Sequence, residues 1–177
     1  MDFNAIPTGE NVPHEVKAII EIPAQSEPVK YEADKKLGVL RIDRIMSAGM
    51  RYPHNYGFIP RTLARDGDPL DIIVLAPFAL ERLSLIACRP VGLLNMTDQA
   101  GPDEKVMAVP IDSVCPATMS IRGLDDVGEY TLNQLKFFFE NYKALEPGKW
   151  VKFEGWSAVD ESYDAIRQAV TAFSEDA

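Results

Sequence analysis

The sequence predicts a mainly β (α+β) protein, a small antiparallel barrel with two flanking helices. Six short apolar segments come first, and consecutive short strands joined by Gly and Pro turns are typical of a barrel rather than of a doubly wound parallel sheet. Two stretches with helical periodicity follow, with one further strand between them. No break in composition marks a boundary, so we expect residues 1–177 to form a single domain.

Two-residue alternation, short apolar runs and strand-like composition predict the first six strands. Residues 16–24 alternate in this way and predict a half-buried strand. The next five strands are predicted around Lys30 and Glu32 and over residues 37–45, 72–75, 83–96 and 106–111. Leu40, Ile42 and Arg44 share one face of their strand, so we expect an apolar row that ends in Arg44 where the core meets a cleft.

Apolar residues at three- and four-residue steps predict the two helices. The first covers residues 129–145 and stops before Pro147 and Gly148, residue types that end helices. Residues 149–156 then predict a strand, and residues 157–174 predict a closing amphipathic helix.

Charge and apolar pattern exclude several classes of protein. The chain has 27 Asp and Glu against 18 Lys and Arg, a net charge of −9, which argues against a binder of duplex nucleic acid. No apolar run reaches the roughly 18 residues that cross a bilayer, and residues 1–10 lack the features of a secretion signal. We therefore expect a soluble, cytoplasmic protein that does not bind membranes, with Cys88 and Cys115 as reduced thiols.

The densest chemical signal is the acidic segment over residues 66–71, Asp-Gly-Asp-Pro-Leu-Asp. Asp, Gly and Pro are ordinary turn residues, so a solvated turn is one interpretation. Three crowded carboxylates repel one another unless cations lie between them, and Asp71 adjoins an apolar strand where an unpaired carboxylate is costly. The pattern therefore favours a site for a hard cation.

Two common motifs fail to explain this segment. A calcium loop that starts at Asp66 would need Gly at the position of Asp71 and Glu at the position of Pro77. A phosphate-binding P-loop is also absent from the sequence, because Gly148 and Lys149 are followed by Trp150 instead of Ser or Thr.

A second acidic segment, residues 98–105, links two predicted strands. Alone it is compatible with an exposed hairpin tip, but together with residues 66–71 it would supply the carboxylates that two or more Mg²⁺ ions need. Arg44 is the hardest cation to explain as a surface residue, because the guanidinium binds carboxylate or phosphate in a fork.

Short motifs along most of the chain occur in the order and at the spacing of a known family. They are Ile20-Glu21-Ile22-Pro23, Lys30-Tyr31-Glu32, Asp43-Arg44, Tyr52-Pro53-His54-Asn55-Tyr56-Gly57, residues 66–71, Arg89-Pro90-Val91-Gly92, Met96-Thr97-Asp98, Tyr142-Lys143 and Gly148-Lys149-Trp150-Val151-Lys152. From about Val16 to Trp156 the sequence resembles soluble inorganic pyrophosphatases of the compact prokaryotic type. The resemblance implies a closed five-stranded OB-type barrel with additional short strands, two flanking helices and a homohexamer.

The resemblance also implies hydrolysis of pyrophosphate to two orthophosphates by a metal-activated water, with several Mg²⁺ ions in each site. Asp68 matches the general base of the family. The residues that match metal ligands are Asp66, Asp71, Asp98, Asp103 and Glu32. Those that match substrate-binding groups are Lys30, Arg44, Tyr56, Tyr142 and Lys143, and those that match supporting positions are Glu21, Tyr52 and Lys105. Gln99 departs from the family, whose members often carry a second acid there.

The net charge of these residues predicts that metal ions bind before pyrophosphate. The seven acids and four cations leave a formal charge of −3, so the site without metal ions would repel pyrophosphate. Two other functions stay open. One is a metal-dependent hydrolase of nucleotide polyphosphates, which would need a pocket that stacks a base. The other is a non-catalytic module that binds single-stranded nucleic acid through aromatic residues such as Tyr52 and Tyr56.

Overall fold

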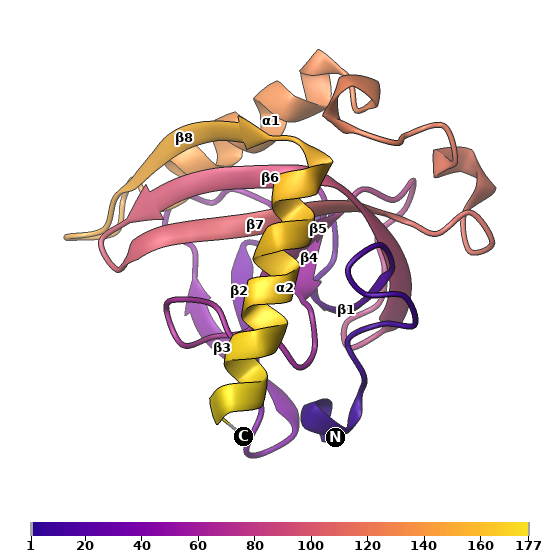
Figure 1. Ribbon diagram of the computed structural model, residues 1–177. Coiled ribbons are helices and arrows are strands. Elements are labelled where there is room, and N and C mark those ends of the chain that lie inside the picture. The colour runs from indigo at the N-terminus through magenta and orange to yellow at the C-terminus, as the bar shows by residue number, and fades with distance from the viewer. Residues whose placement is uncertain (1, 177) are drawn as a thin grey trace.

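The computed structural model describes residues 2–176, and a β-sheet forms its centre (Figure 1). The strands of this sheet are β1 (Val16–Ile22), β4 (Asn55–Phe58), β5 (Asp71–Val74), β6 (Leu85–Asp98), β7 (Gly101–Pro110) and β8 (Val151–Ser157). They lie in the order β1-β4-β5-β7-β6-β8, and β1 also pairs with β6. The first five in this order therefore form a ring, with β8 attached outside it, which confirms the predicted mainly β fold.

One pair in the ring runs parallel, although the sequence predicted an antiparallel barrel. The pair is β5 and β7, which align Asp71 with Lys105 and Val74 with Ala108. The other neighbours in the ring are antiparallel. The strand β7 lies between β5 and β6 in the sheet, although it follows both in the chain. It runs antiparallel to β6 and therefore has the same direction as β5. The parallel register places an acid beside a lysine at the start of both strands.

The strand β1 is buried on both faces, so the predicted half-buried strand is wrong. Ile20 packs in the cluster on the α2 side of the sheet, and Ile22 packs in the cluster on the α1 side. Ile19 meets Phe3 and Phe58 in a third cluster. The strand also contains a register shift between Ile20 and Ile22, an irregularity that redirects side chains.

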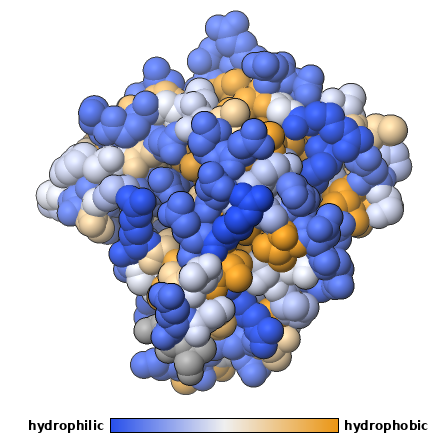
Figure 2. Space-filling model, in the orientation of Figure 1, coloured by the Kyte–Doolittle hydropathy of each residue, from blue (hydrophilic) through white to orange (hydrophobic). Residues whose placement is uncertain are grey.

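The two helices cover opposite faces of the sheet. They are α1 (Glu129–Asn141), which lies along β8, and α2 (Val159–Asp176), which crosses the long strands (Figure 1). Three short 3₁₀ helices are Phe3–Ala5, Pro116–Thr118 and Leu124–Asp126. The face over α2 is mainly hydrophilic, with small apolar patches (Figure 2). No helix among residues 2–176 is long and apolar enough to cross a membrane.

Helix α1 is shorter than the periodicity predicted, and helix α2 has the predicted length but begins and ends two residues later. Helix α1 ends at Asn141, and Leu145 is 66% exposed instead of continuing the buried stripe. The chain leaves the helix in tight turns, with the Glu146 N–H donating to the Lys143 carbonyl. Helix α2 starts at Val159, because Ser157 stays in β8 and its hydroxyl accepts a hydrogen bond from Asn95.

A separate hairpin consists of β2 (Val29–Asp34) and β3 (Val39–Ile45). Its outer face is in solvent, and Ile42 is 61% exposed. The predicted apolar row through Leu40, Ile42 and Arg44 is therefore not part of the core. The hairpin is a sheet of its own with a register shift between Lys30 and Tyr31, so simple alternation does not describe its faces.

The strand β4 lies in a segment that the sequence did not predict as a strand. Four residues are too few to show alternation, and Gly57 in its middle favours a turn. In the structure Gly57 allows β4 to approach β1 closely: a Cβ atom there would lie 1.8 Å from the Ile19 carbonyl oxygen.

We predict that Gly57→Ala lowers the free energy of unfolding by about 3 kcal/mol or more, because two paired strands must separate to admit the methyl group. Denaturant unfolding measures the loss. Gly123→Ala is the matched control, since a Cβ there has nothing within 4 Å and Gly123 has an extended backbone. Equal stability of the two variants would contradict the prediction.

Candidate active site

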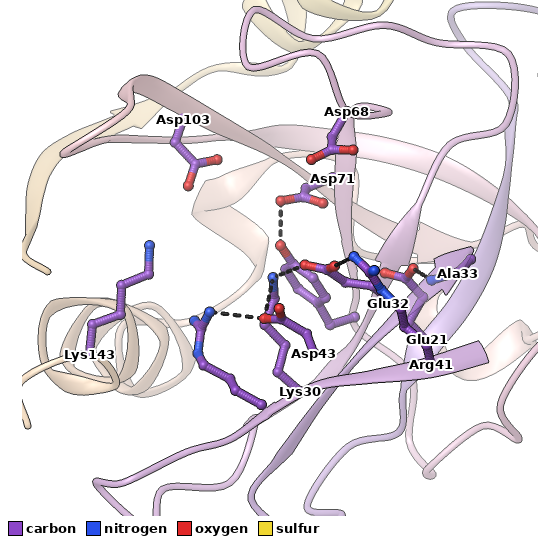
Figure 3. A network of polar contacts seen from close by, with 12 residues as sticks. Glu21, Lys30, Glu32, Ala33, Arg41, Asp43, Asp68, Asp71, Asp103 and Lys143 are labelled. Atoms are coloured by element: carbon purple, nitrogen blue, oxygen red, sulfur yellow. Dashed lines mark hydrogen bonds and ion pairs between the residues drawn. The ribbon is translucent and has the colours of Figure 1, made fainter. Parts of the chain in front are cut away.

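A polar cavity of about 240 Å³ brings together the residues that the sequence singled out. The predicted site residues that line it are Glu21, Lys30, Glu32, Arg44, Tyr56, Asp66, Asp68, Asp71, Asp98, Asp103, Lys105, Tyr142 and Lys143. Figure 3 shows Asp68, Asp71 and Asp103 on one side of this space, with Glu32 and Lys30 across from them. The side chains come from the ring, from the turn before β5, from the β2–β3 hairpin and from the turn after α1. Their separate roles stay predictions.

Tyr52 is the predicted site residue that does not line the cavity. Its ring is buried and packs 4.9 Å from the Tyr56 ring and 4.6 Å from the Phe138 ring, centroid to centroid. Burial raises the pKa of Tyr52 to about 12, although Lys30 and Lys105 oppose the shift. Tyr52 is therefore a neutral phenol that supports the cavity from below.

Lys105 is the centre of the charge network. The side chain is 2% exposed, and its Nζ lies 2.6 Å from Asp71 Oδ2 and 2.8 Å from Asp103 Oδ1. Burial opposes the charge on this ammonium, but Asp71 and Asp103 outweigh burial and hold its pKa well above the ordinary value. Lys105 also donates to Tyr56 Oη over 3.2 Å, and Tyr56 donates to Asp71.

The turn over residues 66–71 combines a buried anchor with exposed acids. The Leu70 N–H donates to Thr62 Oγ1 over 2.9 Å, and both residues are buried. The Asp68 N–H donates to Asp66 Oδ1 over 3.0 Å. Partial burial raises the pKa of Asp66, and the charges of Asp71, Asp68 and Asp103 add to this rise. The carboxylates of the two acidic segments therefore repel one another electrostatically.

Asp98 and Lys143 form a second, buried ion pair. Lys143 Nζ lies 2.7 Å from Asp98 Oδ2, and each side chain is 9% exposed. Burial alone would raise the pKa of Asp98, but the hydrogen bond from Lys143 lowers it. Burial lowers the pKa of Lys143, despite the attraction of Asp98. Gln99, the departure from the family, donates its amide to Asp98 over 3.2 Å.

The second acidic segment is a strand for most of its length, which corrects the predicted loop over residues 98–105. The turn holds only Gln99 and Ala100, and the ladder pairs Asp103 with Met96. Alternation is hard to see here because the strand contains charged residues that face the cavity. The ladder fixes Asp103 rigidly beside β5.

The β2–β3 hairpin supplies the cations opposite the acids. Lys30 Nζ lies 2.5 Å from Glu32 Oε1 and 3.5 Å from Asp43 Oδ2. Arg44 Nη1 donates to Asp43 over 2.9 Å, and Arg44 Nε lies 2.9 Å from Glu146 Oε1 at an angle unsuited to a hydrogen bond. Arg44 Nη2 is buried and has no partner among the described residues, so one nitrogen of the fork is available to an anionic ligand.

The sequence assigned no role in the site to several residues of this network. They are Lys35, Asp43, Glu146 and Lys149, together with Arg41, which lies 3.3 Å from Glu32. The position of Asp43 next to Arg44 in the sequence could have indicated that it belongs to the network. Glu146 and Lys35 lie in turns, where no periodicity shows which way a side chain points.

Hard oxygen donors dominate the cavity, which is the donor set that Mg²⁺ prefers. A cationic nitrogen, Lys105 Nζ, already lies between the carboxylates of Asp71 and Asp103, so these two acids are within reach of a common cation. As the side chains stand, no group of three or more His, Cys, Asp or Glu side chains within residues 2–176 is arranged to hold a metal ion. The residue types fit Mg²⁺, and the lysine contacts would have to rearrange around it.

The fold and the cavity define an OB-type β-barrel protein with an acidic, oxygen-rich site. The family model described as inorganic pyrophosphatase matches residues 18–174. An inorganic pyrophosphatase of Ralstonia nicotianae is 51% identical over 175 residues, which cover 99% of this chain and all of the relative. One of Pseudomonas aeruginosa is 48% identical, with the same coverage of both chains. The chain therefore belongs to the inorganic pyrophosphatase family, a family of enzymes.

Solved structures of the family have the same fold. The inorganic pyrophosphatase of Coxiella burnetii superposes with a TM-score of 0.92 at 43% identity, over 95% of this chain and 99% of the other. That of Thermus thermophilus superposes with a TM-score of 0.93 at 38% identity, over 98% and 99% of the two chains.

Glu21 generates a prediction about pH. Burial raises the pKa of this carboxyl from 4.5 to about 8, although the Ala33 N–H donates to Glu21 Oε1 over 2.6 Å and lowers it. The folded protein thus binds a proton that the unfolded chain releases above about pH 4.5. Its contribution to stability is complete below that pH and is lost as the pH rises toward 8.

We predict that Glu21→Gln, which keeps the acceptor oxygen, gains stability relative to the original protein as the pH rises from 5 to 8. The gain should approach about 1.4 kcal/mol for each pH unit in the metal-free protein. Denaturant unfolding with a chelator present, at several pH values, measures it. A difference between the two proteins that does not change with pH would contradict the raised pKa.

Proposed function

We propose that this protein hydrolyses inorganic pyrophosphate to two orthophosphates in a reaction that depends on Mg²⁺. The observation that carries this proposal is the interleaving of carboxylates and cations in one cavity of about 240 Å³. Membership of the pyrophosphatase family supports the substrate. The cavity has a size and charge pattern suited to a small, highly charged anion.

Five acids are the proposed ligands of several Mg²⁺ ions. They are Asp66, Asp71, Asp98, Asp103 and Glu32. When bound, these ions would neutralise the acids and lower the pKa of a coordinated water toward neutrality. The acids come from a turn, from three strands of the ring and from the hairpin, so the fold must form before the ligands can act together.

The proposed binding groups for the phosphates are the cations and phenols of the cavity. Arg44 has a free, buried nitrogen for a phosphate oxygen, and Lys30 lies next to it across the β2–β3 ladder. Lys143 reaches the cavity from the turn after α1. Charge-assisted hydrogen bonds from such groups stabilise the negative charge that grows on a leaving phosphate.

Asp68 is the proposed general base. Its side chain is 75% exposed and lines the cavity, so its carboxylate can reach a water molecule there. Asp71 and Asp103 are more deeply placed, because their side chains are 27% and 18% exposed and contact Lys105. Asp68 is thus better placed than Asp71 or Asp103 to accept a proton and release it to solvent.

The two rival functions find less support in the cavity. Its aromatic residues are Tyr56, Phe58 and Tyr142, and all three are buried in the core, so they offer no open face for a nucleotide base. The acids around them would repel the backbone of a nucleic acid.

The homohexamer implied by the resemblance stays a prediction. Tyr130 and Phe137 are 80% and 63% exposed on the outer side of α1, and such an assembly could bury this apolar surface.

We predict that phosphate release from pyrophosphate rises with added Mg²⁺ and falls to the background rate when EDTA removes it. Release from ATP under the same conditions should be far slower, because the cavity has no surface for the base. Equal rates with the two substrates, or full activity in EDTA, would contradict the proposal. An oligonucleotide binding assay tests the nucleic-acid alternative.

We predict that Asp68→Asn lowers kcat by roughly 100-fold or more, the scale expected for loss of a general base. The fold should remain, because the side chain is mostly exposed and its backbone contact to Asp66 does not need the carboxylate. Asp164→Asn, an exposed acid on α2, is the control and should retain full activity. Turnover near the original rate would remove Asp68 from this role.

A further inference from the structure

The turn between β2 and β3 brings a lysine to the proposed base. Lys35 Nζ lies 3.3 Å from Asp68 Oδ1, and Lys35 lines the same cavity as the acids. We propose that Lys35 is a positioning residue that holds the carboxylate of Asp68 in its working orientation. This inference rests on the proposed function, because it acts through the residue assigned there as general base.

The orientation of Asp68 has few other determinants. Its main chain is held within the turn, with the N–H donating to Asp66 and the carbonyl accepting from the Ala64 N–H. Its side chain is 75% exposed, and Lys35 is its hydrogen-bond and ion-pair partner among the described residues. Without this contact the carboxylate is free to rotate into solvent. Asp68 Oδ2 stays open to a water molecule when Oδ1 is held.

The turn itself is built to present Lys35. Asp34 Oδ1 accepts hydrogen bonds from the N–H groups of Lys36 and Leu37 over 3.0 and 2.9 Å. Gly38 closes the turn with a φ of 66°, a value that suits glycine. These bonds fix the backbone at Lys35, so its side chain starts from a defined place and not from a flexible tip.

The same contact fastens the tip of the hairpin to the body of the protein. The hairpin is a separate sheet, and it carries Lys30, Glu32 and Arg44. Two residues before Lys35, the Ala33 N–H donates to Glu21. The Lys35 contact adds an attachment at the far end, to the acidic turn itself. A loss of this contact should therefore loosen the tip as well as the carboxylate.

Adjacent lysines provide a matched pair of variants. Lys36 is exposed, and its ammonium has no ion-pair partner in the described part of the chain. We expect Lys35→Met to lower kcat by about two- to fivefold, the scale of an exposed ion pair, with KM for pyrophosphate unchanged. Lys36→Met should match the original protein, and Lys35→Arg should recover most of kcat. In the Asp68→Asn background Lys35→Met should have no further effect.

Hydrogen exchange in the metal-free protein gives a readout that needs no turnover. Backbone amides of residues 34–39 should exchange faster in Lys35→Met and in Asp68→Asn, and at the original rate in Lys36→Met. Equal exchange rates of these amides in all three variants would show that the Lys35–Asp68 contact does not hold the turn, and would overturn the proposal.

The kinetic outcomes separate this inference from the proposed function. If Lys35→Met and Lys36→Met have the same kcat, or if Lys35→Met raises KM and leaves kcat unchanged, Lys35 does not position the base. A full effect of Lys35→Met in the Asp68→Asn background would also overturn it. If the original protein releases no phosphate from pyrophosphate in Mg²⁺, the proposed function itself is wrong.

Discussion

The burial of one lysine between two aspartates is the constraint on which the rest of the site depends. A buried ammonium is costly unless anions surround it, and Lys105 meets this need with Asp71 and Asp103. The parallel register of β5 and β7 sets Asp71 opposite Lys105, and alternation along β7 puts Asp103 on the same face. One strand pairing therefore fixes two acids and the cation between them, and the acidic turn just before β5 follows from it.

An aromatic floor beneath the cavity strengthens the electrostatic interactions among these charges. The rings of Tyr52, Tyr56, Phe138, Phe139 and Tyr142 pack together beneath the cavity, between the sheet and α1. Apolar surroundings on one side lower the local dielectric response, so charges above the floor interact more strongly than they would in water. The phenol of Tyr56 also connects the floor to the acids through Asp71 and Lys105. The core and the site thus share residues, and a change in either affects both.

The protein's own cations neutralise part of the acidic charge in the structure described. Lys105, Lys143 and Lys30 each contact a carboxylate proposed as a metal ligand, and Lys35 contacts the proposed base. Such pairing limits the repulsion among acids that would otherwise destabilise the fold. It also means that incoming Mg²⁺ and pyrophosphate would exchange partners with lysines already in place. The hairpin brings several of these cations, so its attachment to the ring matters for the charge balance of the cavity.

The sequence by itself determined the mainly β class and the helix and strand order near the C-terminal end, because apolar periodicity is a local signal. Most residues that line the cavity were predicted from the order of short motifs along the chain, and their roles stay predictions. The sequence did not determine that β5 and β7 run parallel, that β4 is a strand, or that β1 is buried on both faces. Those features depend on which strands become neighbours, as Gly57 against Ile19 illustrates. Tertiary structure alone also decided the partners of Lys35 and Glu146, since a turn residue has no periodicity and its contacts come from whichever segment folds beside it.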